Sequence, residues 1–153
     1  MAERTPRQVL DAYFDAMNRA DWALLREVLA DGYVEDYPQS GERVRGRENA
    51  IAVRSRGPRP APHEGASAAA ELVVGGEERW ALAPNFTAIR VTTEGDTLTA
   101  LIRAMYPDGL WYVVYIATIQ NGQVQRATMI FGAMFDAPDW RAQWTERMPD
   151  RER

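Results

Sequence analysis

The chain of 153 residues contains no cysteine, no lysine and a single histidine, His63. Without cysteine it can form no disulfide, no catalytic thiolate and no cysteine-ligated zinc site. Without lysine it can form neither a Schiff base with a substrate nor the lysine-dependent phosphate-binding loop. One histidine cannot supply a multi-histidine metal site within one chain. Any chemistry must therefore depend on carboxylates, tyrosines, arginines or a bound cofactor.

Charge and hydropathy exclude several kinds of partner. The net charge is −4 and the arginines are scattered, so we predict no nucleic-acid partner. The densest basic run, Arg43, Arg45 and Arg47, is more typical of a solvated hairpin edge than of a phosphate site. No apolar run approaches the ~20 residues that span a bilayer, and the N-terminus lacks the apolar region of a signal peptide. We expect one cytoplasmic domain over residues 1–153, with no membrane partner.

Helical patterns open the chain. Thr5, Pro6 and Gln8 form a helix start with a capping box, and apolar residues then recur on one face. Asp21 can cap a second helix, which Gly32 ends, and a short third helix is expected over residues 48–55. Residues 57–69, which include His63, form a Pro-, Gly- and Ala-rich loop. In the tail, a short helix over residues 136–144 would place Trp140 and Trp144 on one face, where packing against the body is the more common role.

The remaining segments predict β-strands. The candidates are residues 33–37, 71–75, 79–82, 86–93, 97–106, 111–120 and 123–135. Asn121-Gly122 is a strong hairpin signal, and strands joined by tight hairpins are antiparallel. Residues 98–106 and 111–119 carry apolar side chains on both faces of the predicted strands, so both sheet faces should be covered. Since the helices can cover only one face, we predict a homodimer through the other.

This order of elements resembles the nuclear-transport-factor-2-like superfamily. The stretches L10-D-A-Y-F-D-A-M-N-R-A-D21 and L29-A-D-G-Y-V-E-D36 look like the opening of ketosteroid isomerases. Residues 36–49 and 135–144 are similar to segments of SnoaL-like polyketide cyclase relatives. The resemblance covers about residues 5–144. It implies an α+β cone, in which a curved antiparallel sheet wraps around a long N-terminal helix, with three helices and an enclosed apolar cavity.

The resemblance also suggests site residues. Asp36 matches the isomerase general base, and Tyr13 matches the tyrosine that donates a hydrogen bond to the substrate oxygen. Arg54 falls where the family has a tyrosine that supports the helix-one tyrosine. The family's second oxyanion donor, a carboxylic acid, does not carry over, because its position falls near Ile116. The residues expected to line the cavity are Met17, Arg54, Tyr112, Val114, Ile116, Thr118, Ala127, Met129 and Phe131.

Each catalytic candidate has a structural alternative. Asp36 could face solvent or pair with an arginine such as Arg43 or Arg45, and Tyr13 could be a core tyrosine with a satisfied hydroxyl. Glu35 is expected on the opposite strand face from Asp36, so the two do not form an acid–base dyad. The catalytic hypothesis requires Asp36 and Tyr13 to point into one cavity, within about 8 Å of each other.

We therefore hypothesise that the protein binds a small, largely apolar ligand, such as a carbonyl compound. The expected chemistry is cofactor-independent proton transfer, as in an isomerase, cyclase or lyase, with Asp36 as base and Tyr13 as donor. No metal and no cofactor are expected. One alternative is a non-catalytic ligand-binding or dimerisation module. Another is an epoxide-hydrolase-like hydrolase, whose Asp-Arg-Asp constellation finds no matching carboxylates around Arg103 and Arg126.

Overall fold

The computed structural model describes residues 3–56, 80–81, 86–106 and 109–149, so the whole 57–69 loop with His63 and the expected strand 71–75 lie outside the described residues. The first half holds α1 (Pro6–Arg19), α2 (Trp22–Val28), β1 (Leu29–Tyr37), β2 (Glu42–Arg45) and α3 (Arg47–Arg56). The second half holds β3 (Trp80–Ala81), β4 (Phe86–Glu94), β5 (Thr97–Tyr106), β6 (Gly109–Gln120), β7 (Gln123–Ala133) and the 3-10 helix η1 (Asp139–Trp144). The expected α+β class is confirmed.

The helix starts follow the sequence signals. Thr5 and Gln8 form the capping box, in which the Thr5 backbone N–H donates to Gln8 Oε1 at 2.9 Å and Pro6 opens α1. Asp21 Oδ1 accepts from the Leu24 backbone N–H at 3.0 Å and caps α2. These side chains satisfy backbone donors that have no partner inside the helix. Both predicted helix starts are therefore confirmed.

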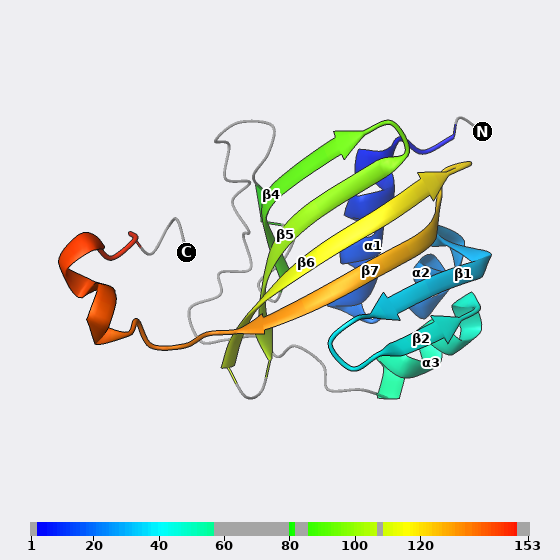
Figure 1. The fold of residues 1–153 in the computed structure, drawn as a ribbon. Helices are drawn as coiled ribbons and strands as arrows, with labels where there is room; N and C mark the ends of the chain where they lie inside the picture. Colours follow the sequence, from blue (N-terminus) through cyan, green and yellow to red (C-terminus); the bar gives the residue numbers. More distant parts are fainter. Residues whose placement is uncertain (1–2, 57–79, 82–85, 107–108, 150–153) are drawn as a thin grey trace.

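The described strands form one curved sheet in the order β2-β1-β7-β6-β5-β4-β3 (Figure 1). Strands β4 to β7 pair antiparallel through successive hairpins, as predicted. The prediction of an antiparallel sheet is wrong at one junction, because β1 pairs with β7 in parallel. These two strands are far apart in the chain, so no hairpin constrains their direction. The sheet is therefore mixed.

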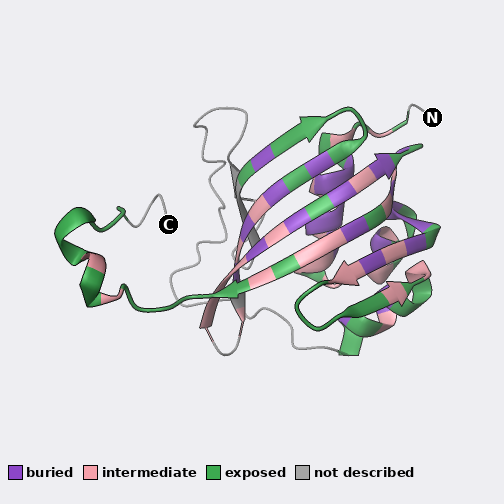
Figure 2. Ribbon diagram, viewed as in Figure 1, coloured by how far each residue is buried: buried purple, intermediate pink, exposed green. Residues whose placement is uncertain are grey.

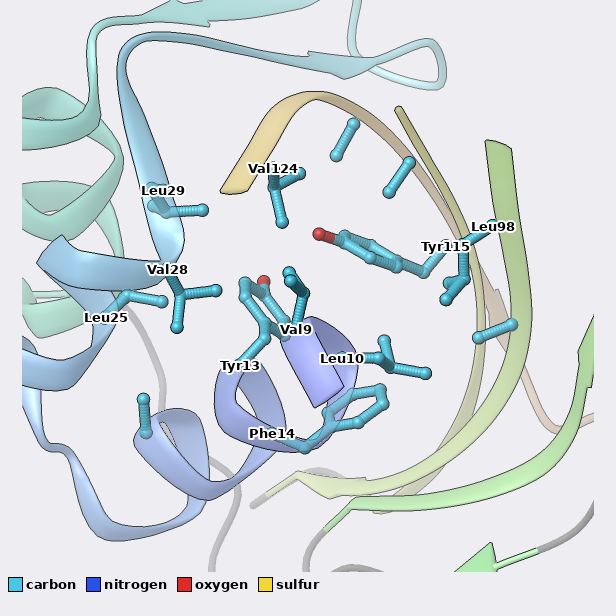
Figure 3. Close-up of a cluster of buried hydrophobic side chains, with 14 of the residues drawn as sticks. Val9, Leu10, Tyr13, Phe14, Leu25, Val28, Leu29, Leu98, Tyr115 and Val124 are labelled. Carbon is cyan, nitrogen blue, oxygen red and sulfur yellow. The ribbon is translucent and has the colours of Figure 1, made fainter. Parts of the chain in front are cut away.

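Helix α1 lies inside the curve of the sheet and supplies the centre of the core (Figures 1 and 3). Its buried face joins apolar side chains from α2 and from the concave side of the strands. The Tyr13 ring stacks on Tyr115 of β6, with ring centroids 5.1 Å apart. The core includes Val9, Leu10, Tyr13, Phe14, Leu25, Val28, Leu29, Leu98, Ile102, Val113, Tyr115, Val124 and Ala127. No helix among the described residues is both long and apolar enough to cross a membrane.

The orientation expected for β6 is wrong. Alternate residues point inward, and these are Val113, Tyr115, Ala117 and Ile119. The residues expected to line the cavity, Tyr112, Val114, Ile116 and Thr118, lie on the outer face instead. Both faces of this strand carry apolar side chains, so hydropathy alone does not show which face points inward. A shift of one residue in register then exchanges the two faces.

The tail also differs from expectation. Trp140 and Trp144 are each 73% exposed, so they do not pack against the body. The tail leaves the end of β7 and projects away from the sheet (Figure 1). Its expected helix is present only as the short η1, which has no buried residue.

The Asn121-Gly122 turn generates a stability prediction. Both residues have positive φ, and a Cβ on Gly122 would lie 3.1 Å from the Arg4 backbone nitrogen. We expect Gly122→Ala to lower the free energy of unfolding by about 1–2 kcal/mol, which corresponds to roughly 2–8 °C in Tm. Gly32→Ala is the matched control, because nothing lies within 4 Å of its added Cβ. Equal changes in Tm for the two variants in thermal unfolding would contradict the assignment.

Candidate functional site

A polar cluster lies on the concave side of the sheet, within an otherwise apolar core. Glu35 and Arg54 are the two buried charged residues of the described chain, with exposed fractions of 0% and 9%. Four tyrosines surround them. We call this group the tyrosine–carboxylate cluster: Tyr13, Tyr33, Glu35, Tyr37, Arg54 and Tyr115.

Three separate segments bring the cluster together. Tyr33, Glu35 and Tyr37 alternate along β1, so strand geometry points all three to the concave side. Arg54 comes from the last turn of α3, and its Nη1 donates to the Ala50 carbonyl at 3.0 Å. Tyr13 comes from the buried face of α1. The cluster therefore depends on the packing of β1, α1 and α3.

The Glu35 carboxylate accepts three hydrogen bonds. The Tyr33 hydroxyl donates to Oε2 at 2.5 Å, the Tyr37 hydroxyl donates to Oε1, and Arg54 Nη2 donates to Oε2 in a buried ion pair. A buried carboxylate without such partners would carry a large desolvation cost. The guanidinium and the two phenols therefore offset the cost of burying the Glu35 carboxylate inside the core.

Two phenol protons of the cluster have no hydrogen-bond acceptor among the described residues. Arg54 Nη2 donates to the Tyr13 oxygen at 2.9 Å, so Tyr13 acts as an acceptor, and no acceptor among the described residues takes its own proton. The Tyr115 hydroxyl is buried and meets the distance and angle of a hydrogen bond with no described residue, although the Tyr33 hydroxyl lies close enough to lower its pKa. Both rings lie inside the curve of the sheet (Figure 3). A ligand with an acceptor oxygen would satisfy these donors.

Burial keeps these tyrosines protonated. It raises the pKa of Tyr13, an effect that the Arg54 charge opposes and the Glu35 charge reinforces. Burial also raises the pKa of Tyr115 well above its usual range, and the nearby Tyr13 adds to the effect. Both phenols are therefore hydrogen-bond donors throughout the neutral pH range.

The partly exposed edge of the cluster is formed by Tyr37, which is half-buried. Its ring stacks on Phe131 with centroids 6.1 Å apart, and Met129 Sδ lies 4.0 Å from Arg54 Nη2. Gln39 holds this edge to β7, since the Phe131 backbone N–H donates to Gln39 Oε1 at 2.5 Å and Gln39 Nε2 donates to the Phe131 carbonyl.

Several expected lining residues do lie on the concave side. Met129 and Phe131 pack against the core there, and so do Met17 of α1 and the buried Ala127. Their contact with a ligand stays a prediction.

The expected position of Asp36 is wrong. Asp36 lies on the outer face of β1, where Arg43 Nε and Nη2 donate to its two oxygens at 2.5 and 3.0 Å. Arg126 Nη2 donates to Oδ2 at 2.5 Å. The alternative of an arginine-paired Asp36 is therefore confirmed, and Asp36 and Tyr13 lie on opposite sides of the sheet. The inward carboxylate is its neighbour Glu35, which the sequence reasoning assigned to the other face.

A signal in the sequence could have identified Glu35. Tyr33-Val34-Glu35-Asp36-Tyr37 places tyrosines two residues before and after Glu35, on the same strand face. Such phenols can satisfy a buried carboxylate, whereas Asp36 has no comparable neighbours at that spacing. Among the described residues, no group of three or more His, Cys, Asp or Glu side chains could hold a metal ion.

The Asp36 ion pairs generate a pH prediction. Hydrogen bonds from Arg43, then those from Arg126, hold the pKa of Asp36 well below its usual range. A lowered pKa in the folded state stabilises the protein above the unfolded-state pKa of about 4, and this stabilisation is lost as the pH falls. We expect Asp36→Asn to have a lower Tm than the parent at pH 7, with a difference that shrinks below about pH 4. A Tm difference that stays constant from pH 7 to pH 2.5 would contradict this account.

No family model and no curated protein sequence matches the chain. Among solved structures, an NTF-2 like protein of unknown function from Burkholderia xenovorans LB400 is 30% identical, with a TM-score of 0.71 and coverage of 94% of each chain.

Two more distant structures share the fold. A candidate ketosteroid isomerase from Kribbella flavida DSM 17836 is 20% identical, with a TM-score of 0.69 and coverage of 94% of this chain and 89% of the other. An LEH-like epoxide hydrolase from M. tuberculosis is 12% identical, with a TM-score of 0.56 and coverage of 81% and 80%. The fold is thus shared by proteins with different activities. With 30% identity over nearly its whole length to the Burkholderia protein, the chain belongs to the NTF2-like family.

Proposed function

We propose that the protein binds a small, largely apolar carbonyl compound at the tyrosine–carboxylate cluster and catalyses a cofactor-independent proton transfer. The reaction would be of the isomerase, cyclase or lyase type. The observation that supports this proposal is a buried carboxylate–guanidinium pair beside two phenols, Tyr13 and Tyr115, whose protons have no acceptor among the described residues. The shared fold with a candidate ketosteroid isomerase is consistent with it.

Tyr13 is the proposed oxyanion donor. Because Arg54 donates to the Tyr13 oxygen, the guanidinium strengthens the phenol as a donor and stabilises negative charge that develops next to it. Tyr115 offers a second phenol from the concave side of β6. It is adjacent in sequence to Ile116, where the family resemblance placed the missing acid. A single well-placed oxyanion donor contributes about 10²–10³ in rate.

Glu35 is the proposed base in place of Asp36. A carboxylate offers about four lone-pair positions, and three donors occupy Glu35 in the structure. Tyr37 is the only one of these donors that is partly exposed, so a ligand that enters at this edge can displace its hydroxyl. In the proposed step the C–H bond next to the carbonyl breaks, the proton passes to Glu35, and the electron pair moves to the carbonyl oxygen as an enolate. Return of the proton to another carbon completes an isomerisation.

The competing function is a non-catalytic ligand-binding module. The full set of hydrogen bonds to Glu35 favours it, because three donors already occupy lone pairs that a substrate proton would need. The hydrolase alternative needs two carboxylates around an arginine, whereas Glu35 is the only buried carboxylate among the described residues. The proton-transfer enzyme and the binding module differ in whether a bound ligand exchanges a proton with the protein.

The adjacent residues Glu35 and Asp36 allow a matched test. We expect the parent protein to catalyse deuterium exchange next to the carbonyl in at least one member of a panel of enolisable ketones, followed by NMR in D₂O. Glu35→Gln should slow this exchange about 10²-fold or more, as loss of a general base does. Asp36→Asn should leave the rate within about threefold, because Asp36 lies on the outer face. Loss of exchange in Asp36→Asn alone would refute the assignment of Glu35. Ligand binding without exchange in the parent would establish the binding module.

Tyr13→Phe tests the donor separately. It removes the proposed oxyanion donor, and Arg54 keeps its contact with Glu35. We expect kcat for proton exchange to fall about 10²–10³-fold, with little change in KM. Tyr112→Phe on the outer face is the control and should retain the parental rate. An unchanged kcat in Tyr13→Phe would exclude this tyrosine as the donor.

A further inference from the structure

The turn that joins β1 to β2 is held to β7 by the side chain of one residue, Gln39. The Phe131 backbone N–H donates to Gln39 Oε1 at 2.5 Å, and Gln39 Nε2 donates to the Phe131 carbonyl. Among the described residues, these are the only hydrogen bonds between residues 38–41 and β7. We call this pair of hydrogen bonds the Gln39 latch.

The Gln39 latch extends the parallel pairing of β1 with β7 beyond the end of the backbone ladder. The last backbone pair is Asp36 with Thr128, which are 92 residues apart, and Gln39 and Phe131 are also 92 residues apart. The Gln39 carboxamide therefore presents a donor and an acceptor where a strand residue would present its peptide groups. A side chain can rotate away from these bonds, so the latch can open while the ladder stays intact.

The tip of this hairpin lies at the edge of the sheet. Strand β2 is the outermost strand on its side, and the turn and most of β2 are exposed (Figures 1 and 2). Within the tip, the backbone N–H groups of Ser40 and Gly41 donate to the Tyr37 carbonyl at 3.3 and 2.9 Å, so Tyr37 moves together with the turn. Segments held by exposed hydrogen bonds open more readily than the core of a sheet.

Tyr37 connects the Gln39 latch to the tyrosine–carboxylate cluster. Its ring stacks on Phe131 with centroids 6.1 Å apart, and its hydroxyl donates to Glu35 Oε1. When the turn leaves β7, the Tyr37 hydroxyl moves away from Glu35. The other two donors to this carboxylate, Tyr33 and Arg54, are buried and do not belong to the turn. Opening of the latch therefore frees one oxygen of Glu35 and leaves the rest of the cluster in place.

We propose that Gln39 is a positioning residue that controls entry to the tyrosine–carboxylate cluster. With the latch closed, the Tyr37 hydroxyl occupies Glu35, and with the latch open, the ligand takes its place. The identity of that ligand, a carbonyl compound, rests on the proposed function. Each exposed hydrogen bond shifts such an equilibrium about 2- to 10-fold, so two of them keep the latch mostly closed but able to open. The fraction of open protein then sets the apparent affinity for the ligand.

The first experiment measures opening without the ligand. The chain has no cysteine, so Ala127→Cys places a single thiol on the concave face, where Ala127 is buried and pairs with Glu35. Iodoacetamide, a small neutral amide, alkylates such a thiol only when the protein opens. Adding Gln39→Met, which keeps the side-chain length but removes the amide, should raise the alkylation rate about 10-fold or more. Adding Gln125→Ala instead is the matched control and should retain the rate, because this amide donates to the Gln120 carbonyl, away from the latch. Equal rates with and without the Gln39 amide would overturn the proposal.

Hydrogen exchange measures the same opening in a chain without the added thiol. The Phe131 N–H donates to Gln39 Oε1, so Gln39→Met should lower the protection of this amide. We expect a loss of about 10-fold or more, while the amides between β5 and β6 keep the protection that they have in the parent protein. Unchanged protection of Phe131, or an equal loss throughout the sheet, would overturn the latch.

Kinetics links the Gln39 latch to the proposed function. For a ketone whose deuterium exchange the parent protein catalyses, Gln39→Met should lower KM about 10-fold, because more of the protein is open. We expect kcat to stay within about threefold, since Glu35 and Tyr13 are unchanged. A fall in kcat with an unchanged KM would overturn control of entry by Gln39. If the parent protein exchanges no ketone, the proposed chemistry fails, whereas alkylation and hydrogen exchange still decide whether Gln39 controls entry.

Discussion

The buried ion pair between Glu35 and Arg54 is the interaction on which the rest of the interior depends. Removing two charges from water costs several kcal/mol for each, and their attraction offsets this only when further hydrogen bonds are present. The tyrosines of β1 supply those bonds. Because Arg54 also contacts Tyr13, the pair links α3, β1 and α1. Apolar side chains of the same total volume would fill this space, but they would not link these three segments through directional contacts.

The local structure could be predicted well from the sequence. The Thr5 and Asp21 caps, the Asn121-Gly122 turn and the order of the elements all depend on short-range chemistry that a few residues determine. The family resemblance also predicted the overall fold. The parallel pairing of β1 with β7 could not be obtained in that way, because it joins segments that are far apart in the chain.

The site was predicted only in part, and the errors share one physical cause. A strand has a side-chain period of two, so a one-residue error moves every side chain to the other face. On the helices the buried face was predicted correctly, because Tyr13 lies on the buried face of α1 and Arg54 contacts it from α3. On β1 the error exchanged Glu35 with Asp36, and on β6 it exchanged Tyr115 with Ile116. Hydropathy could not correct either error, since Glu35 and Asp36 are equally polar and β6 is apolar on both faces.

The two hydrogen bonds of Gln39 have a mechanical consequence. They join the β1–β2 turn to the backbone of Phe131, near the end of β7. Tyr37, the partly exposed member of the cluster, directly precedes that turn and stacks on Phe131. The end of β7 and the partly exposed edge of the cluster are therefore joined by two hydrogen bonds and a ring stack. Loss of the Gln39 side chain would therefore act on the Tyr37 hydroxyl, and through it on the Glu35 carboxylate, as well as on the turn.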